Sequence, residues 1–115
     1  MYPLELSKQL HYFQSEVFAW SLQNFGDPIL ETAHNALLGV VEEVGELSHA
    51  HLKQAQGIRG TQEEHDAAKQ DAVGDIIIYL ADYCSRNGLS LARCVCDTWD
   101  VVQQRNWKAN KVDGS

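Results

Sequence analysis

The chain has 115 residues, of which 44% are hydrophobic, and a formal net charge of −7. This length supplies one compact domain spanning residues 1–115 and is too short for two. The acidic balance argues against a nucleic-acid-binding surface, because affinity for phosphate backbones comes from clustered Lys and Arg. The longest uncharged apolar run, 76–81, is too short to span a bilayer, and nothing near Met1 resembles a signal peptide. We therefore expect a soluble cytoplasmic protein without membrane contacts.

The first half of the chain predicts two helices. Apolar residues recur at helical spacing over 4–22, and this helix is expected to end near the glycine stop at 24–26. Asp27-Pro28 is a start signal for the next helix, because Asp is a favoured N-cap and Pro suits the first helical position. The apolar spacing then continues the second helix to about Gln54, ahead of a glycine-bracketed loop at 57–60.

The second half predicts two further helices and no strands. Residues 61–64, Thr-Gln-Glu-Glu, fit a capping box that starts a third helix, which is expected to run to Arg86. Ser90 is a suitable cap for a fourth helix that ends near Val102, and the polar residues at about 107–115 are expected to form a loose tail. The predicted fold is all-α and four-helix-bundle-like, with two long antiparallel helices that carry the acidic motifs described below.

The second and third predicted helices are long for a chain of this size. Each has roughly 25 residues, or about 37 Å at 1.5 Å per residue. A small monomer has little else with which to cover the apolar faces of such helices. We therefore expect a homodimer or a homotetramer, in which a second copy completes the bundle.

The three cysteines do not form a metal-binding pattern. Cys94 and Cys96 are two residues apart in a predicted helix, which turns their side chains to different faces. Together with Cys84 they are odd in number, and free cysteines are commonly buried. We expect them to be reduced and mostly packed.

Two pairs of acidic residues share helix faces inside apolar runs. Glu43 and Glu46 lie about 60° apart on a helical projection, and Asp71 and Asp75 about 40° apart. Burying four acids together without a cation is very unfavourable, whereas a hard divalent cation such as Mg²⁺ between the two long helices stabilises them. The alternative is that these are ordinary exposed acids on amphipathic helices. Glu42 points about 100° away from Glu43. It is expected to face solvent or to contact the cation ligands without contacting the cation itself.

Two segments around these acids resemble the signature of a known family. Residues 42–47, Glu-Glu-Val-Gly-Glu-Leu, are similar to the first motif of the MazG-like nucleotide pyrophosphohydrolases of the all-α NTP pyrophosphatase superfamily. Residues 74–80, Gly-Asp-Ile-Ile-Ile-Tyr-Leu, are similar to the second motif, and the resemblance covers most of the chain. One departure is Ala72, where the family carries an acid three residues before the position of Asp75. Asp71 is expected to substitute, because residues four apart share a helix face.

This resemblance implies an enzyme that hydrolyses a nucleoside triphosphate, expected to be a deoxynucleotide, to the monophosphate and pyrophosphate. The implied role is the cleaning of the nucleotide pool, and the preferred base stays open on the sequence. The implied cofactor is Mg²⁺, for which Mn²⁺ can substitute, held by Glu43, Glu46, Asp71 and Asp75. Glu46 is the expected catalytic base that accepts a proton from the attacking water.

Aromatic and polar residues near the motifs are candidates for substrate binding. Trp20 and Tyr79 match family positions on the nucleoside side, although aromatic residues at helical spacing also suit a core. Lys53 and Arg59 follow the first acidic helix and are placed to reach distal phosphates, and a lysine in the tail has the same chemistry. Each of these cations equally suits a solvated surface. The candidates are Trp20, Asn24, Lys53, Arg59, Tyr79 and Lys108.

The sequence is also compatible with two other functions. Glu46 and His49 match the Glu-x-x-His element of di-iron carboxylate bundles, and a homodimer would supply the second copy that such a centre needs. The missing acid at Ala72 is also compatible with a helical module that binds nucleotides without hydrolysing them. Bound iron without phosphatase activity would identify the first, and tight nucleotide binding without pyrophosphate release would identify the second.

Overall fold

The computed structural model describes residues 4–26 and 29–115, with side chains from residue 33 onward in the second segment. These segments contain four α-helices and no strand, so the all-α prediction is confirmed. The predicted start signal at Asp27-Pro28 lies outside the described residues. The helices are α1 (Leu4–Phe25), α2 (Ile29–Gln56), α3 (Gln62–Arg86) and α4 (Leu91–Val102). None of these described helices combines the length and the apolar character that crossing a bilayer requires.

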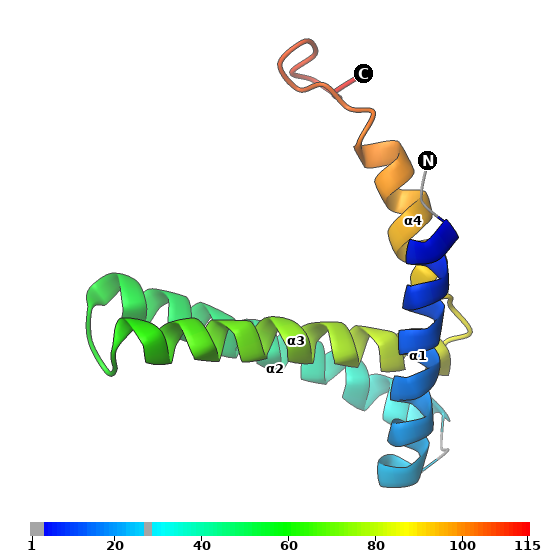
Figure 1. The fold of residues 1–115 in the computed structure, drawn as a ribbon, viewed down its shortest axis with the longest axis horizontal. Helices are drawn as coiled ribbons and strands as arrows, with labels where there is room; N and C mark the ends of the chain where they lie inside the picture. Colours follow the sequence, from blue (N-terminus) through cyan, green and yellow to red (C-terminus); the bar gives the residue numbers. More distant parts are fainter. Residues whose placement is uncertain (1–3, 27–28) are drawn as a thin grey trace.

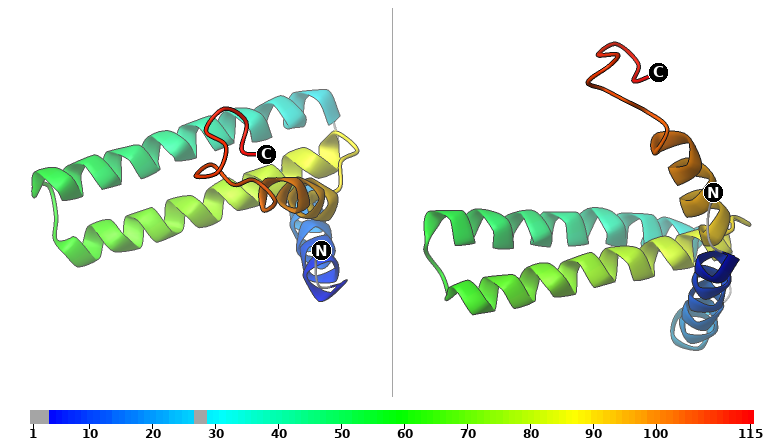
Figure 2. Two further views of the ribbon diagram at one scale, coloured as in Figure 1. Left: turned by 90° about the horizontal axis from the view of Figure 1, so that it is seen from above. Right: turned by 45° about the horizontal axis from the view of Figure 1, so that its top comes forward.

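The two long helices, α2 and α3, form an antiparallel hairpin, and α1 and α4 gather at its open end (Figure 1). α1 crosses the hairpin there, and α4 packs against α1 (Figure 2). The packing between helices is bundle-like, but the molecule is open. Its extents are 48 × 42 × 25 Å and its radius of gyration is 17.3 Å. A compact chain of this length has a radius of gyration of about 13 Å, so one copy leaves much of the hairpin uncovered.

The start of α3 is determined by local hydrogen bonds that the sequence predicts. The Thr61 hydroxyl accepts from the backbone N–H of Glu64 at 3.1 Å, and the Glu64 carboxylate accepts from the backbone N–H of Thr61 at 3.1 Å. This reciprocal pair is the predicted capping box. His65 Nε2 lies 3.0 Å from the carbonyl oxygen of Ile58 and ties the preceding loop to the helix.

The core lies where α1 meets α3 and α4. Gln14 on α1 is buried, and its amide nitrogen donates to Ser85 Oγ at 3.0 Å and to Leu89 O at 2.9 Å. Its amide oxygen accepts from the backbone N–H of Leu91 at 2.8 Å. These partners satisfy the buried amide and fix three segments relative to one another. The apolar residues of this core are Leu10, Phe13, Val17, Ala81, Cys84 and Leu91.

A buried ion pair within α3 lies beside this core and is hydrogen-bonded to α1. Arg86 Nε lies 3.2 Å from both carboxylate oxygens of Asp82, one helical turn earlier. Arg86 Nη2 donates to Ser21 Oγ on α1 at 2.8 Å, and the guanidinium lies 5.6 Å from the centre of the Phe18 ring. The Arg86 side chain is 0% exposed and that of Asp82 is 12% exposed. The pair therefore holds the Asp82 carboxylate in a fixed position.

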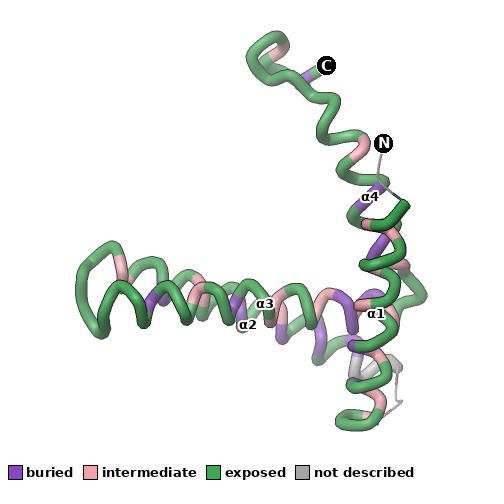
Figure 3. Tube along the Cα trace, in the orientation of Figure 1, coloured by how far each residue is buried: buried purple, intermediate pink, exposed green. Residues whose placement is uncertain are grey.

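Much of the hairpin surface is exposed, and it includes large apolar side chains (Figure 3). The buried apolar residues of α2 and α3 along this pair are small, and include Ala36, Ala50 and Ala72. The large apolar side chains lie outside this seam, and monomeric proteins rarely expose so many together. They are Leu37, Leu38, Val41, Val44, Leu52, Val73, Ile77 and Ile78.

The residues after α4 fold into turns, where the sequence predicts a loose tail. The backbone N–H of Asn106 donates to Gly114 O, and the Asn106 side-chain oxygen accepts from Ala109 N at 3.0 Å. The Asn110 side-chain oxygen accepts from Val112 N at 3.0 Å. The tail therefore has local hydrogen bonds of its own, and it continues beyond α4, away from the hairpin (Figure 1).

Candidate metal centre

Three acidic side chains meet midway along α2. One carboxylate oxygen from each of Glu42, Glu43 and Glu46 lies within 4.8 Å of the other two. Glu43 is 8% exposed, and its Oε2 atom is buried without a hydrogen-bond partner among the described residues. A buried carboxylate oxygen without a donor is costly, and folded proteins have few of them. Glu43 therefore offers an oxygen that nothing in the described part of the chain satisfies.

Asp75 brings the second long helix to this cluster. Burial raises the pKa of the Glu43 carboxyl, and the negative charges of Glu46 and Asp75 raise it further. Burial also raises the pKa of Asp75, followed by the charge of Asp71 and the contact with it, and then by Glu46. The acids that the sequence pairs on two helices thus act on one another across the hairpin. A positive charge between them would favour their ionised forms.

Glu42 lies closer to the other acids than the helical projection predicts. Its side chain is exposed, as expected, yet its carboxylate belongs to the same group of oxygens as those of Glu43 and Glu46. A helical projection gives each side chain one fixed direction from the helix axis. The torsions of a glutamate side chain nevertheless allow its carboxylate to turn toward a neighbour. The only sequence signal for this was the adjacency of two glutamates at 42–43.

Ala72 is 2% exposed and packs in the seam between α2 and α3. This is the position at which the resembled family carries an acid. Asp71, one residue earlier, is exposed and affects the pKa of Asp75, whereas it does not contribute to the raised pKa of Glu43. The structure therefore places Asp71 at the rim of the cluster, beside Asp75.

A hollow of about 320 Å³ opens beside Glu43 and Asp75. Its other walls are aromatic and aliphatic apart from one further acid. Trp20 is 52% exposed, and its ring meets that of Phe25 edge to face with centroids 5.7 Å apart. Trp20 lines the hollow. The sequence allowed either core packing or base stacking for this residue, and its exposure excludes packing in the core of one chain. The remaining lining residues are Val17, Ile78, Tyr79 and Asp82.

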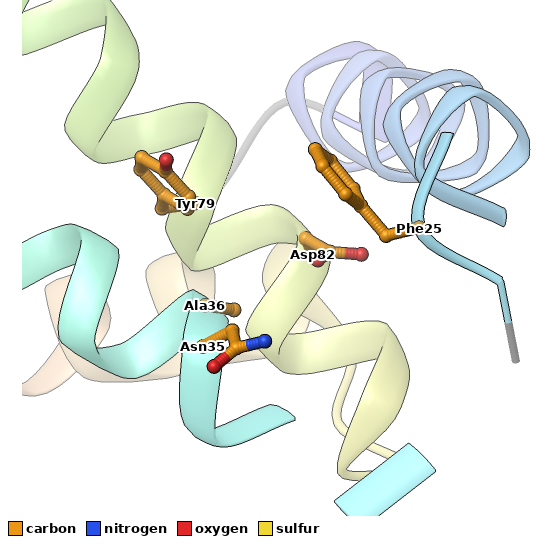
Figure 4. A pocket seen from close by; sticks show the side chains of 5 residues that line it. All are labelled: Phe25, Asn35, Ala36, Tyr79 and Asp82. Carbon is orange, nitrogen blue, oxygen red and sulfur yellow. The ribbon is translucent and has the colours of Figure 1, made fainter. Parts of the chain in front are cut away.

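Tyr79 also lines a smaller hollow of about 130 Å³ (Figure 4). Burial raises the pKa of the Tyr79 hydroxyl, and the negative charges of Glu42 and Glu43 raise it further. The hydroxyl therefore stays protonated at neutral pH and can donate a hydrogen bond. The residues around this hollow are Phe25, Asn35, Ala36, Tyr79 and Asp82.

The other predicted substrate-binding residues do not line either of the two hollows. Asn24 donates from Nδ2 to the carbonyl oxygen of Trp20 at 2.9 Å, which satisfies a backbone group near the end of α1. Lys53 is in the last turn of α2 and Arg59 is in the hairpin turn, at the end of the hairpin opposite α1 (Figure 1). Lys108 is in the tail beyond α4. One chain does not bring these cations to the acids.

No family model, curated protein or solved structure matches this chain. The donor atoms of the site therefore indicate which cation it fits. The group formed by Glu42, Glu43 and Glu46 contains carboxylates alone, and His49 is exposed and outside it. Hard cations such as Mg²⁺ and Mn²⁺ prefer oxygen ligands, whereas softer metals prefer His or Cys. A hard divalent cation would also satisfy the buried oxygen of Glu43, so these residues fit Mg²⁺.

Proposed function

We propose that this chain is a Mg²⁺-dependent nucleoside triphosphate pyrophosphohydrolase, which converts a (d)NTP and water to the (d)NMP and pyrophosphate. Glu43 carries the proposal, because its unsatisfied buried oxygen lies among other acids at the edge of an aromatic hollow. An acid cluster of this kind can hold a cation that binds phosphates, and an aromatic hollow can take a base. The MazG-like motifs at 42–47 and 74–80 support the same assignment.

The acids have different roles in this proposal. Glu43 and Asp75, the less exposed ones, hold the cation from α2 and α3, and Glu46 and Asp71 contribute further oxygens. When bound, Mg²⁺, or Mn²⁺ in its place, supplies the positive charge that neutralises the phosphate oxygens. Glu46 is exposed and close to Glu43, so it can accept the proton of the attacking water as a general base.

In this proposal the larger hollow binds the nucleoside. Trp20 offers an exposed ring on one wall, and Tyr79 lies on another beside the acids. A base stacked on an aromatic side chain gains about 1–3 kcal/mol. That interaction orients a substrate whose phosphates lie at the acids. Deoxynucleotides as substrates, and a role in cleaning the nucleotide pool, are part of the proposal.

A homodimer or homotetramer is also part of the proposal. Leu38 and Val41 on α2 are 64% and 63% exposed, among other large apolar residues of the hairpin. Two such hairpins packed together would form a bundle of four long helices. Light scattering after gel filtration should give a dimer or tetramer mass, which Val41→Glu reduces to that of a monomer. Ala55→Glu, at an exposed position near the end of α2, is the control, and a monomeric wild type would contradict this part.

Pyrophosphate release from the four dNTPs and the four NTPs with Mg²⁺ tests the activity. Glu43→Gln keeps the size of the side chain and removes its charge, so it should abolish release, as should EDTA. Glu63→Gln changes an exposed acid in the first turn of α3 and should leave the activity at the wild-type level. The products should be a nucleoside monophosphate and pyrophosphate.

Other products or a different response to metal would contradict the proposal. Orthophosphate release would mean that a different phosphoric anhydride bond is cleaved. Nucleotide binding without turnover would favour the non-catalytic module that Ala72 suggests. Bound iron without any phosphatase activity would favour the di-iron bundle.

A further inference from the structure

The smaller hollow holds two polar side chains that the proposed hydrolysis does not use. Asn35 from α2 and Asp82 from α3 project from neighbouring helices into the space that faces the ring of Phe25 (Figure 4). Asp82 and Tyr79 also line the larger hollow, which includes Glu43. The two hollows therefore share walls and lead from the acid cluster to the pair formed by Asn35 and Asp82.

Asp82 is held as a hydrogen-bond acceptor at this place. Both of its oxygens lie 3.2 Å from Arg86 Nε, and Arg86 is anchored in turn to Ser21. The Arg86 side chain is fully buried, while 12% of the Asp82 side chain is exposed, and Asp82 lines both hollows. A ligand in the hollow thus meets a carboxylate with a fixed orientation, which accepts hydrogen bonds and cannot donate them when ionised.

The distance along α3 suits a nucleotide. Asp75 and Asp82 are seven residues apart, which is about 10 Å at 1.5 Å per residue. Tyr79 lies between them, and all three residues border the larger hollow. This separation is comparable to the span between the α-phosphate of a nucleotide and the far edge of its base. Phosphates at Asp75 would therefore bring the far edge of the base to Asp82.

We propose that Asp82 and Asn35 select nucleotides whose base has an amino group on C4 of a pyrimidine or C6 of a purine, namely cytosine or adenine, over those with a keto group at that position. This inference rests on the proposed function. The amino groups of cytosine and adenine are hydrogen-bond donors, whereas guanine and thymine present a carbonyl oxygen at the same position. An amino group donates to the Asp82 carboxylate, and the amide of Asn35 donates to the adjacent ring nitrogen. A keto oxygen at that place faces a negative charge, so nucleotides with a keto group there bind less tightly.

Relative kcat/KM values for dCTP, dATP, dGTP, dTTP and dUTP test this selection. The wild type should prefer dCTP and dATP by about 10- to 100-fold, the range expected for a directional base contact. Asp82→Asn adds a donor and should reduce this preference. Asn35→Leu changes an exposed residue without breaking the Arg86 ion pair, and it should reduce the preference even if Asp82→Asn fails to fold. Asp97→Asn, on the exposed surface of α4, is the matched control.

A second measurement separates this inference from the proposed hydrolysis. Deoxycytidine and deoxyuridine are titrated into the protein in EDTA, and binding is followed by calorimetry. Tighter binding of deoxycytidine, lost in Asn35→Leu, supports the base contact even if no triphosphate is hydrolysed. Hydrolysis of all the dNTPs at equal kcat/KM would overturn the base contact and leave the proposed function intact. Equal binding of both nucleosides, or binding of neither, would also overturn it.

Discussion

The ring of Tyr79 on α3 lies directly over Gly39 on α2, so closely that a Cβ on Gly39 would be 2.6 Å from Tyr79 Cζ. Only a glycine leaves room for the ring at this crossing of the hairpin. Because Tyr79 lines both hollows, the absence of a side chain at Gly39 also affects the position of the ring that the hollows share. The packing of two helix backbones and the shape of the candidate substrate site thus depend on the same contact.

Replacing Gly39 with alanine should therefore displace Tyr79. Overpacking of this kind costs about 1–3 kcal/mol, which outweighs the gain in helix propensity, and urea denaturation measures the loss. Gly45→Ala is the control in the same helix, because nothing lies within 4 Å of its added Cβ. That control should gain up to about 1 kcal/mol from helix propensity. Equal stability changes in the two variants would show that the Tyr79 contact does not constrain the hairpin.

The acid cluster should make stability depend on pH. Burial raises the pKa of Glu43 above its ordinary value of 4.5, and that of Asp75 is also raised. The folded state therefore holds these protons more tightly than the unfolded state, and stability falls as the pH rises through the window above 4.5. The melting temperature in EDTA should fall between pH 5 and pH 7, and less steeply in Glu43→Gln. The same slope in both proteins would contradict this.

Binding of Mg²⁺ should offset this loss of folding stability at neutral pH. A cation that binds the folded state alone at about 100 times its Kd adds about 2.7 kcal/mol of stability. Thermal melts at pH 7 with and without Mg²⁺ measure the gain, which Glu43→Gln should abolish and Glu63→Gln should retain. An equal increase in the Glu43→Gln variant would place the binding of Mg²⁺ elsewhere.

Breaking the ion pair of Arg86 should destabilise the junction of α1 and α3. Arg86→Met leaves the Asp82 carboxylate without its buried partner, which costs about 3–5 kcal/mol. Ser21→Ala removes one hydrogen bond to a charged group and should cost about 1.5–3 kcal/mol. Chemical denaturation measures both losses. Adding Asp82→Asn to Arg86→Met should recover part of the loss, and additive losses would show that the pair is not coupled.

The cysteines should differ in reactivity. Burial, with a contribution from the neighbouring Cys94, raises the pKa of the Cys84 thiol to about 11. At pH 8 only about a thousandth of it is thiolate, the form that reacts. Cys94 is exposed, whereas Cys84 and Cys96 are buried. Alkylation followed by peptide mass spectrometry should label Cys94 first, and rapid labelling of Cys84 in the native protein would contradict its burial.

Local features were predictable from the sequence. The capping box of Thr61 and Glu64 depends on residues three apart, so its hydrogen bonds need no tertiary contact. The cap at Ser90 also forms, with its hydroxyl accepting from Arg93 N at 3.2 Å. The pairing of acids on α2 and α3 follows from helical geometry in the same way.

Contacts between helices were less predictable. Aromatic residues at helical spacing suit a core or a surface equally, and Trp20 is exposed because α1 meets the hairpin at its open end alone. Lys53 and Arg59 follow Glu46 closely in sequence, but α2 continues to Gln56 and carries the chain away from Glu46 at about 1.5 Å per residue. Glu42 joins the cluster through its side-chain torsions, which no projection of the backbone contains.

The sequence by itself determined that the chain is helical, where the capped helices α3 and α4 begin, and that acids share a face on each long helix. Each of these depends on residues within a turn or two, where backbone geometry fixes the spacing. Only the tertiary structure decided that Glu43 is buried with an unsatisfied oxygen, that Asp75 lies opposite it, and that the ring of Tyr79 takes the space above Gly39. Burial and electrostatic interaction depend on which helix faces meet, and that is settled by packing over the whole chain.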